Sequence, residues 1–216
     1  MHIVVWGMFK VGSTTIYNSL KDSCPDSIQV KKSHTEINTL LDQDVDIAIV
    51  PFRKNTLKQW MSAYFMDIEK PEYPYSPFNR KLACFSHLSS GLRKEIIKMV
   101  DPRILVEDFN LINWRQFEWL NMDLTLNLLK TQFSFTQAPS LSAAVEIIPG
   151  TRRRDGKPLQ FIFIQTEEIS EPNLRGALAQ FLPADVINQI HVVNSNIGTE
   201  NWYGDQYREF LNCMAE

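Results

Sequence analysis

Residues 4–16 have the sequence Val4-Val5-Trp6-Gly7-Met8-Phe9-Lys10-Val11-Gly12-Ser13-Thr14-Thr15-Ile16. The mostly apolar run from His2 to Trp6 predicts a buried strand, and the hydroxyl residues after Gly12 predict the first turn of a helix. Between them, two glycines bound a loop that directs several backbone N–H groups, and the positive end of the helix dipole, at one place. The stretch therefore predicts a site for a phosphate or sulfate group, with an ordinary strand-to-helix turn as the alternative.

The position of the lysine distinguishes this loop from that of the nucleotide triphosphatases. Gly7 and Gly12 keep the spacing of that motif, but Ser13 stands where its lysine belongs, and Lys10 lies two residues before Gly12. The order Lys-x-Gly-Ser-Thr-Thr resembles the 5′-phosphosulfate loop of sulfotransferases that use 3′-phosphoadenosine-5′-phosphosulfate. The resemblance implies that Lys10 also neutralises charge on the departing phosphate during catalysis. The residues that it implies in binding this co-substrate here are Lys10, Val11, Gly12, Ser13, Thr14 and Thr15.

The composition is that of an ordinary globular protein. Of its 216 residues 44% are hydrophobic and 22% charged, and the formal net charge is -3, so we expect one domain over residues 1–216 and no nucleic-acid partner. The three cysteines are far apart and outside any metal-ligand spacing, which predicts reduced thiols. Neither a signal segment nor an apolar run of the roughly 20 residues that span a bilayer is evident. We therefore expect a cytoplasmic protein without a transmembrane segment.

Strands and helices alternate along much of the chain. Besides the first strand, the pattern predicts strands at 27–30, 45–50 (ended by Pro51) and 161–164, and helices at 13–21, 35–41, 55–65, 113–129 and 171–181. This alternation predicts an α/β fold with a central, mostly parallel sheet flanked by helices. In such sheets ligands bind beyond the carboxyl ends of the strands. Lys10, His34 and Arg53 each closely follow a predicted strand, so we expect them at that edge.

Two further segments extend the resemblance. Lys31-Lys32-Ser33-His34 stands where sulfotransferases carry a Lys-Thr-His-like element, which implies that His34 is the catalytic base. Val50-Pro51-Phe52-Arg53 and the helix after it resemble the family's 3′-phosphate element, which implies that Arg53 and Ser62 bind the 3′-phosphate. The family separates this pair by about eight residues, whereas Ser62 follows Arg53 by nine, a shift of about 100° on a helix. A structural or exposed histidine and a surface ion pair are the alternatives for His34 and Arg53.

The middle and the end of the chain carry weaker patterns. Residues 66–80 contain three prolines among aromatic residues, which predicts a surface connection or a lid facing the acceptor. The run from Arg152 to Gly156 predicts a solvated, charged turn. Near the end, Trp202 and Tyr203 match an element of bacterial capsular polysaccharide synthesis proteins, which also look sulfotransferase-like at their N-termini.

Together the resemblances imply a sulfotransferase that works without a metal and transfers a sulfuryl group to a hydroxyl on a small-molecule or saccharide acceptor. Two other classes stay open. A nucleotide-dependent kinase would share the loop but need Mg²⁺ and an acidic ligand near a strand end, for which Asp46, at the start of its strand, is poorly placed. A non-catalytic nucleotide- or saccharide-binding relative would keep the fold without turnover.

Overall fold

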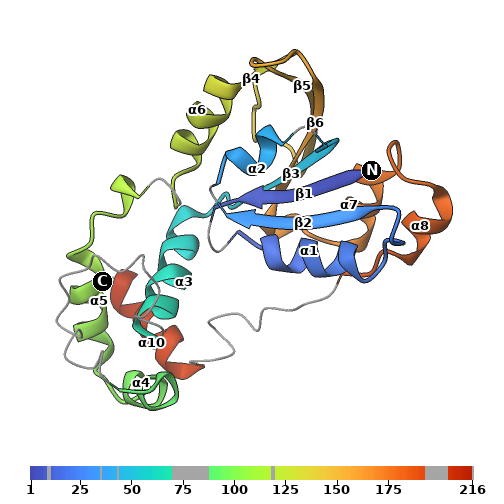
Figure 1. Cartoon of the computed structure of the whole chain (residues 1–216). Coiled ribbons are helices and arrows are strands. Elements are labelled where there is room, and N and C mark those ends of the chain that lie inside the picture. The colour runs from blue at the N-terminus through green and yellow to red at the C-terminus, as the bar shows by residue number, and fades with distance from the viewer. Residues whose placement is uncertain are drawn as a thin grey trace. The chain divides into compact units, whose positions relative to one another are not determined.

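The structure is a computed structural model that describes residues 1–8, 11–34, 36–42, 44–69, 88–117, 120–192 and 204–215. The chain forms two compact units (Figure 1): unit 1 is Met1–Thr56 with Phe117–Asn196, and unit 2 is Leu57–Gln116 with Ile197–Glu216. The expectation of one domain over residues 1–216 stays a prediction. Among the described residues, no helix combines the length and the apolar character that crossing a bilayer requires.

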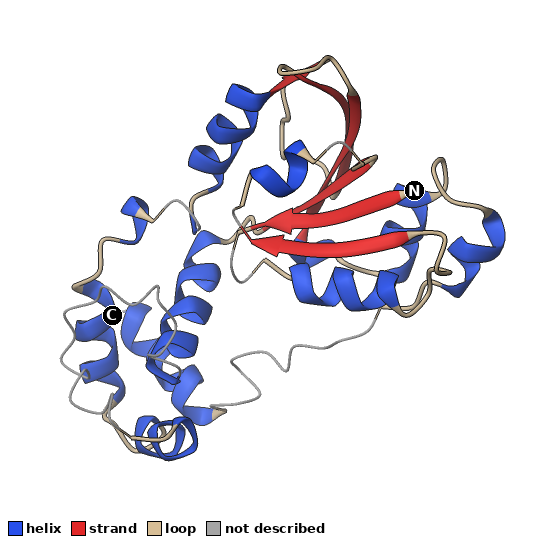
Figure 2. Cartoon of the chain, in the orientation of Figure 1, coloured by secondary structure: helices blue, strands red, loops and turns tan. Residues whose placement is uncertain are grey.

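Unit 1 is built on one six-stranded sheet of order β2-β1-β3-β6-β5-β4 (Figure 2). Its strands are β1 (His2–Gly7), β2 (Gln29–His34), β3 (Ile47–Phe52), β4 (Phe133–Phe135), β5 (Val145–Arg152) and β6 (Pro158–Gln165). The neighbours β2, β1, β3 and β6 are parallel, whereas β5 and β4 join by antiparallel pairing. The predicted α/β class with a mostly parallel sheet is therefore confirmed.

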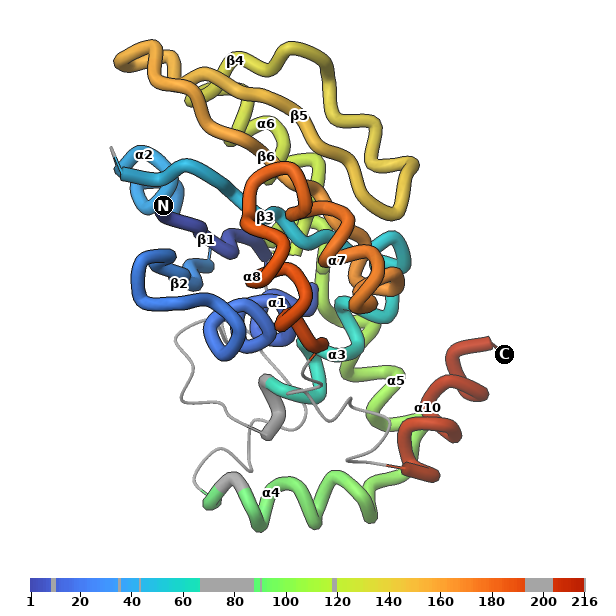
Figure 3. The backbone as a smooth tube through the Cα atoms, turned by 90° about the vertical axis from the view of Figure 1, so that its right-hand side faces the viewer, coloured from blue at the N-terminus to red at the C-terminus, as the bar shows by residue number. Residues whose placement is uncertain are grey.

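Helices cover both faces of this sheet. The helices of unit 1 are α1 (Ser13–Lys21), α2 (Asn38–Leu41), α6 (Met122–Gln132), α7 (Glu171–Leu178) and α8 (Ala184–Gln189). Apolar side chains of α1, α7 and α8 pack with Ile3 and Val5 on one face, and those of α2 and α6 pack with Val4 and Trp6 on the other. Figure 3 shows these helices from a second direction. Because β1 is buried on both sides, its sequence is a continuous apolar run rather than an alternating one.

Unit 2 is helical. Its elements are α4 (Ser90–Ile97), α5 (Pro102–Asn110), the short 3₁₀ turn η2 (Trp114–Gln116), α10 (Asp205–Ala215) and nearly all of α3 (Thr56–Glu69), whose first residue ends the first segment of unit 1. Aromatic rings form its core: Tyr64 packs edge-on against Phe109 and stacks on Phe210. The Tyr64 hydroxyl donates to the buried carboxylate of Asp108 at 2.9 Å, which satisfies both polar groups.

Several predicted strand ends were wrong: β2 begins at Gln29, β3 begins at Ile47, and the strand expected at 161–164 spans Pro158–Gln165. Two further differences lie at the carboxyl end of the sheet. The second strand was expected at 27–30, but β2 continues to His34 because Lys31–His34 pair in register with Val4–Gly7 of β1. The third strand was expected to end before Pro51, yet β3 includes it. The pairing of β3 with β1 has already ended at Ile49, so Pro51, which has no N–H, lies near the strand end where such a residue is tolerated.

Of the predicted helices, only 13–21 has the observed extent: the helix expected over 55–65 is Thr56–Glu69, and the one expected over 171–181 ends at Leu178. Two others differ more. The helix expected over 113–129 divides into η2 and α6, because the Asn121 side chain accepts the N–H groups of Asp123 and Leu124 and starts a new helix. The helix expected over 35–41 shortens to the four residues of α2. Residues 66–69 belong to α3, while the rest of the predicted lid up to residue 80, as well as Trp202 and Tyr203, lies outside the described residues.

Arg152 was predicted at a solvated turn and is instead 1% exposed at the end of β5. Its Nη2 donates to the carbonyl oxygen of Val45 at 2.9 Å, and its Nη1 lies 3.8 Å from Oδ2 of Asp155. In the same hairpin Arg153 and Arg154 are both exposed, and the Arg153 Nε donates to the carbonyl oxygen of Lys130. Strand alternation turns Arg152 inward, so the prediction was right for its neighbours alone.

Candidate anion-binding site

The loop between β1 and α1 depends on two close backbone approaches. Gly12 has φ of 77° and stands at the N-cap of α1. A Cβ at Gly12 would lie 2.8 Å from Cδ1 of Ile169 and 3.2 Å from Cγ2 of Thr166. At Gly7, a Cβ would lie 3.3 Å from the carbonyl oxygen of Pro51. The left-handed conformation of Gly12 therefore favours glycine, a Cβ there would also make the end of the Ile169 side chain shift, and Gly7 allows close packing against β3.

The N-terminus of α1 offers backbone donors to a ligand. The first intrahelical bond runs from the N–H of Ile16 to the carbonyl of Gly12 at 3.2 Å. The N–H groups of residues 13–15 precede this bond, and such groups have no partner within their own helix. No side chain of the described residues caps the helix, whereas α6 has its Asn121 cap. This combination, at the carboxyl edge of parallel strands, is favourable for an oxyanion.

Lys32 supplies a cation at the same place, a role that the sequence interpretation did not give it. Its Nζ donates to Oγ1 of Thr14 at 3.1 Å and lies 6.0 Å from the centre of the Tyr17 ring. Lys32 pairs in register with Val5, whose side chain packs on the α1 face of the sheet. Residues two apart on a strand lie on the same face of the sheet, so Lys32 shares a face with His34. This spacing could have identified Lys32 as a site residue, once β2 is known to reach His34.

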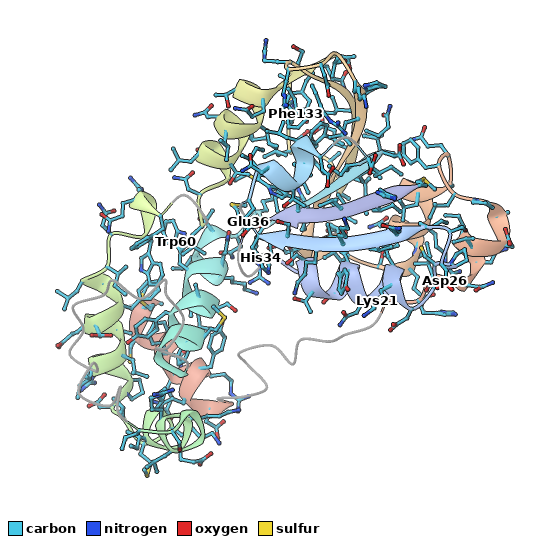
Figure 4. All side chains as sticks on the ribbon, viewed as in Figure 1. Lys21, Asp26, His34, Glu36, Trp60 and Phe133 are labelled. Carbon is cyan, nitrogen blue, oxygen red and sulfur yellow. The ribbon has the colours of Figure 1, made fainter. Side chains whose placement is uncertain are left out.

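His34 is the last residue of β2 and is half-buried (Figure 4). Its Nδ1 lies 3.3 Å from the carbonyl oxygen of Gly7. Because a carbonyl only accepts, Nδ1 carries the proton in the neutral ring and Nε2 has the lone pair. Burial lowers the pKa of His34, the hydrogen bond to Gly7 opposes this, and the charge of Lys32 lowers the pKa further. The imidazole is thus kept neutral at neutral pH, as a general base must be.

A turn from late in the chain joins two of the predicted binding loops. The turn is η4 (Thr166–Glu168), which follows β6 directly. The hydroxyl of Thr166 lies 2.7 Å from the carbonyl oxygen of Val11 and 2.9 Å from that of Phe52. Val11 itself is fully buried, so its side chain belongs to the core and only its backbone can face a ligand. No local pattern in the sequence identifies Thr166 as a contact of either loop.

Arg53 directly follows β3, at the predicted edge of the sheet. Its Nε lies 3.9 Å from Oε1 of Glu167, with side-chain exposures of 23% and 36%. Ser62, its predicted partner, lies on α3 in unit 2. Binding of a 3′-phosphate by Arg53 and Ser62 together therefore stays a prediction. Lys10 lies outside the described residues, and its role likewise stays a prediction.

The carboxyl edge of unit 1 therefore brings together the start of α1, His34 and Lys32, with Arg53 at the end of β3. Asp46 lies at the opposite edge, where its Oδ2 accepts the N–H of His2 at 2.8 Å. Within the described residues no three His, Cys, Asp or Glu side chains gather in a way that could hold a metal ion. No protein-family model, curated protein or solved structure matches the chain significantly.

Proposed function

We propose that this protein is a sulfotransferase that transfers a sulfuryl group from 3′-phosphoadenosine-5′-phosphosulfate to a hydroxyl acceptor. The observation that carries the proposal is the start of α1: a helix whose N-cap residue, Gly12, has no side chain to cap it, accompanied by Lys32 and His34 from the neighbouring strand. The order Lys-x-Gly-Ser-Thr-Thr supports this ligand over a nucleoside triphosphate with Mg²⁺.

Each group has a defined part in the proposed reaction. The N–H groups of residues 13–15 hold the 5′ phosphosulfate, and Arg53 with Ser62 binds the 3′-phosphate. The bond between sulfur and the bridging oxygen breaks while the acceptor oxygen bonds to sulfur. Lys10 and Lys32 stabilise the negative charge on the departing phosphate, and Nε2 of His34 takes the proton of the acceptor hydroxyl. The products are the sulfate ester and adenosine 3′,5′-bisphosphate.

The proposal extends to the setting of the reaction. A saccharide is the proposed acceptor, because Trp202 and Tyr203 resemble the element of capsular polysaccharide synthesis proteins. The proposed compartment is the cytoplasm, in keeping with cysteines in no disulfide spacing. Lysine side chains supply the positive charge, so the proposed reaction needs no metal.

Sulfate transfer to a panel of saccharide and small hydroxyl acceptors tests the proposal. The wild type should transfer sulfate with EDTA present, and Lys10→Ala should lower both turnover and affinity for adenosine 3′,5′-bisphosphate, because the lysine contacts the bound anion as well as the transition state. Lys21→Ala, which removes an equal charge from an exposed position at the other end of α1, is the matched control. Transfer of phosphate from ATP by the same preparation, without transfer of sulfate, would instead identify a kinase.

A further inference from the structure

We propose that Glu167 sets the preference of this site between nucleotides with and without a 3′-phosphate. The inference rests on the proposed function, in which Arg53 receives that phosphate. The Glu167 carboxylate already lies against the donors that an incoming phosphate would use.

Three donors surround this carboxylate. Its Oε1 lies 3.9 Å from Nε of Arg53 and accepts the N–H of Asn55 at 3.5 Å, and its Oε2 accepts the N–H of Lys54 at 3.3 Å. A guanidinium next to consecutive backbone N–H groups is a donor set that proteins present to phosphate. The Glu167 carboxylate, a smaller anion with a single charge, therefore uses the same donors that a bound phosphate would need.

The backbone of Glu167 is held at this place. The preceding residue, Thr166, binds the carbonyl oxygens of Val11 and Phe52, and Ile169 packs against Gly12. The turn that carries Glu167 is thus fixed both to the loop between β1 and α1 and to the end of β3. A 3′-phosphate must therefore rotate the Glu167 side chain away or share the donors with a like charge.

The effect should be selective for the 3′-phosphate. A nucleotide with a 3′-hydroxyl brings no second anion to Arg53 and leaves the Glu167 contacts in place. A partly exposed ion pair and a nearby like charge together change an affinity by roughly three- to tenfold. Removing the charge of Glu167 should therefore tighten binding of the 3′-phosphorylated nucleotide alone.

The test compares Glu167→Gln with Glu168→Gln by titration calorimetry. Glutamine keeps the size of the side chain and an oxygen that can accept one of the two N–H groups, and Glu168 provides the same charge change on the same turn at an exposed position. Glu167→Gln should bind adenosine 3′,5′-bisphosphate about three- to tenfold more tightly and change the affinity for adenosine 5′-monophosphate less than twofold. Glu168→Gln should leave the ratio of the two affinities unchanged.

An unchanged or reduced affinity ratio in Glu167→Gln would overturn the inference. Weaker binding of both nucleotides, with a lower midpoint of urea unfolding, would show that Glu167 serves only to hold Arg53 and the start of α3.

Failure of the proposed function gives a different result, because then the bisphosphate binds neither wild type nor variant. Inorganic phosphate alone is the probe in that case. Glu167→Gln should bind it more tightly than the wild type does, and Arg53→Ala in that background should abolish the gain. If Glu167→Gln binds phosphate more tightly in this way, Glu167 competes with an anion at Arg53 whether or not the nucleotide binds. If it does not, the inference is wrong.

Discussion

The two ends of the sheet in unit 1 use charged residues in opposite ways. At the amino end, Asp46 accepts the N–H of His2 and the buried Arg152 donates to the carbonyl of Val45. At the carboxyl end, the N-cap residue of α1 is Gly12, which has no side chain to cap the helix, and Lys32 and His34 lie beside it. A charged residue near a strand end therefore does not by itself indicate a ligand site. The carboxyl end differs because helix N–H groups remain there for a ligand.

His34→Ala should give the largest effect, a loss of turnover of roughly 10²–10⁴-fold, because general-base catalysis acts in the transition state. Binding of adenosine 3′,5′-bisphosphate should change little. His2→Ala, at the amino end of β1, is the matched control and should keep the wild-type rate. Steady-state sulfate transfer and titration calorimetry measure the two quantities.

The pH profile adds a second check on His34. Its pKa lies below the ordinary value of 6.5, chiefly because burial disfavours the charged ring. The neutral base should therefore persist as pH falls from 8 to about 6.5, and turnover should decline only at more acidic pH, where the imidazole becomes protonated. A variant His34→Ala that keeps its rate over this range would show that another residue is the base.

Arg152→Ala tests the amino end, where we expect an effect on stability and none on ligand binding. The substitution leaves a cavity and an unsatisfied carbonyl at Val45, which should lower the free energy of unfolding by about 2–4 kcal/mol. Arg154→Ala, in the same hairpin but exposed, should change it by less than about 0.5 kcal/mol. Urea unfolding measures both. Nucleotide affinity that fell in Arg152→Ala, with the fold intact, would contradict the division between the two ends.

Gly12 and Gly156 have nearly the same backbone conformation but different surroundings. Gly12 has φ of 77° and Gly156 has φ of 72°, but a Cβ meets Ile169 at 2.8 Å only at Gly12 and has nothing within 4 Å at Gly156. Gly156→Ala should lower the free energy of unfolding by about 1 kcal/mol from backbone strain. Gly12→Ala should lower it by about 2–3 kcal/mol and also abolish stabilisation by the bisphosphate. Equal losses of stability in the two variants, with stabilisation by the bisphosphate intact in both, would contradict an anion-binding site at the start of α1.

Lys32→Ala and Lys31→Ala should give the smallest effects. The two lysines are adjacent on β2 and both exposed, but only Lys32 pairs with Val5 and contacts Thr14 at the start of α1. Lys32→Ala should weaken binding of the bisphosphate by roughly three- to tenfold, the scale of one exposed charged contact. Lys31→Ala should change it less than twofold. Equal losses would indicate a general effect of charge and no specific contact.

The sequence predicted the parts of the fold that depend on local patterns. The start and end of α1 were predicted to the residue, because glycine followed by hydroxyl residues and an apolar stripe are local signals. The end of β2 was missed, since exposed lysines in a strand are stabilised by pairing with β1, which no local pattern contains. The contacts of Lys32, Thr166 and Glu167 were missed for the same reason. They join residues far apart in sequence, such as Thr166 and Val11.

Thermal unfolding with adenosine 3′,5′-bisphosphate, with ATP, and with ATP and Mg²⁺ shows most directly which ligand binds at the start of α1. The bisphosphate should stabilise the fold in EDTA by about 2.7 kcal/mol at a hundredfold excess over its dissociation constant. ATP should stabilise it less, and Mg²⁺ should not increase the effect of ATP. Stabilisation by ATP with Mg²⁺, and none by the bisphosphate, would contradict the proposed function and show that the start of α1 binds a nucleoside triphosphate.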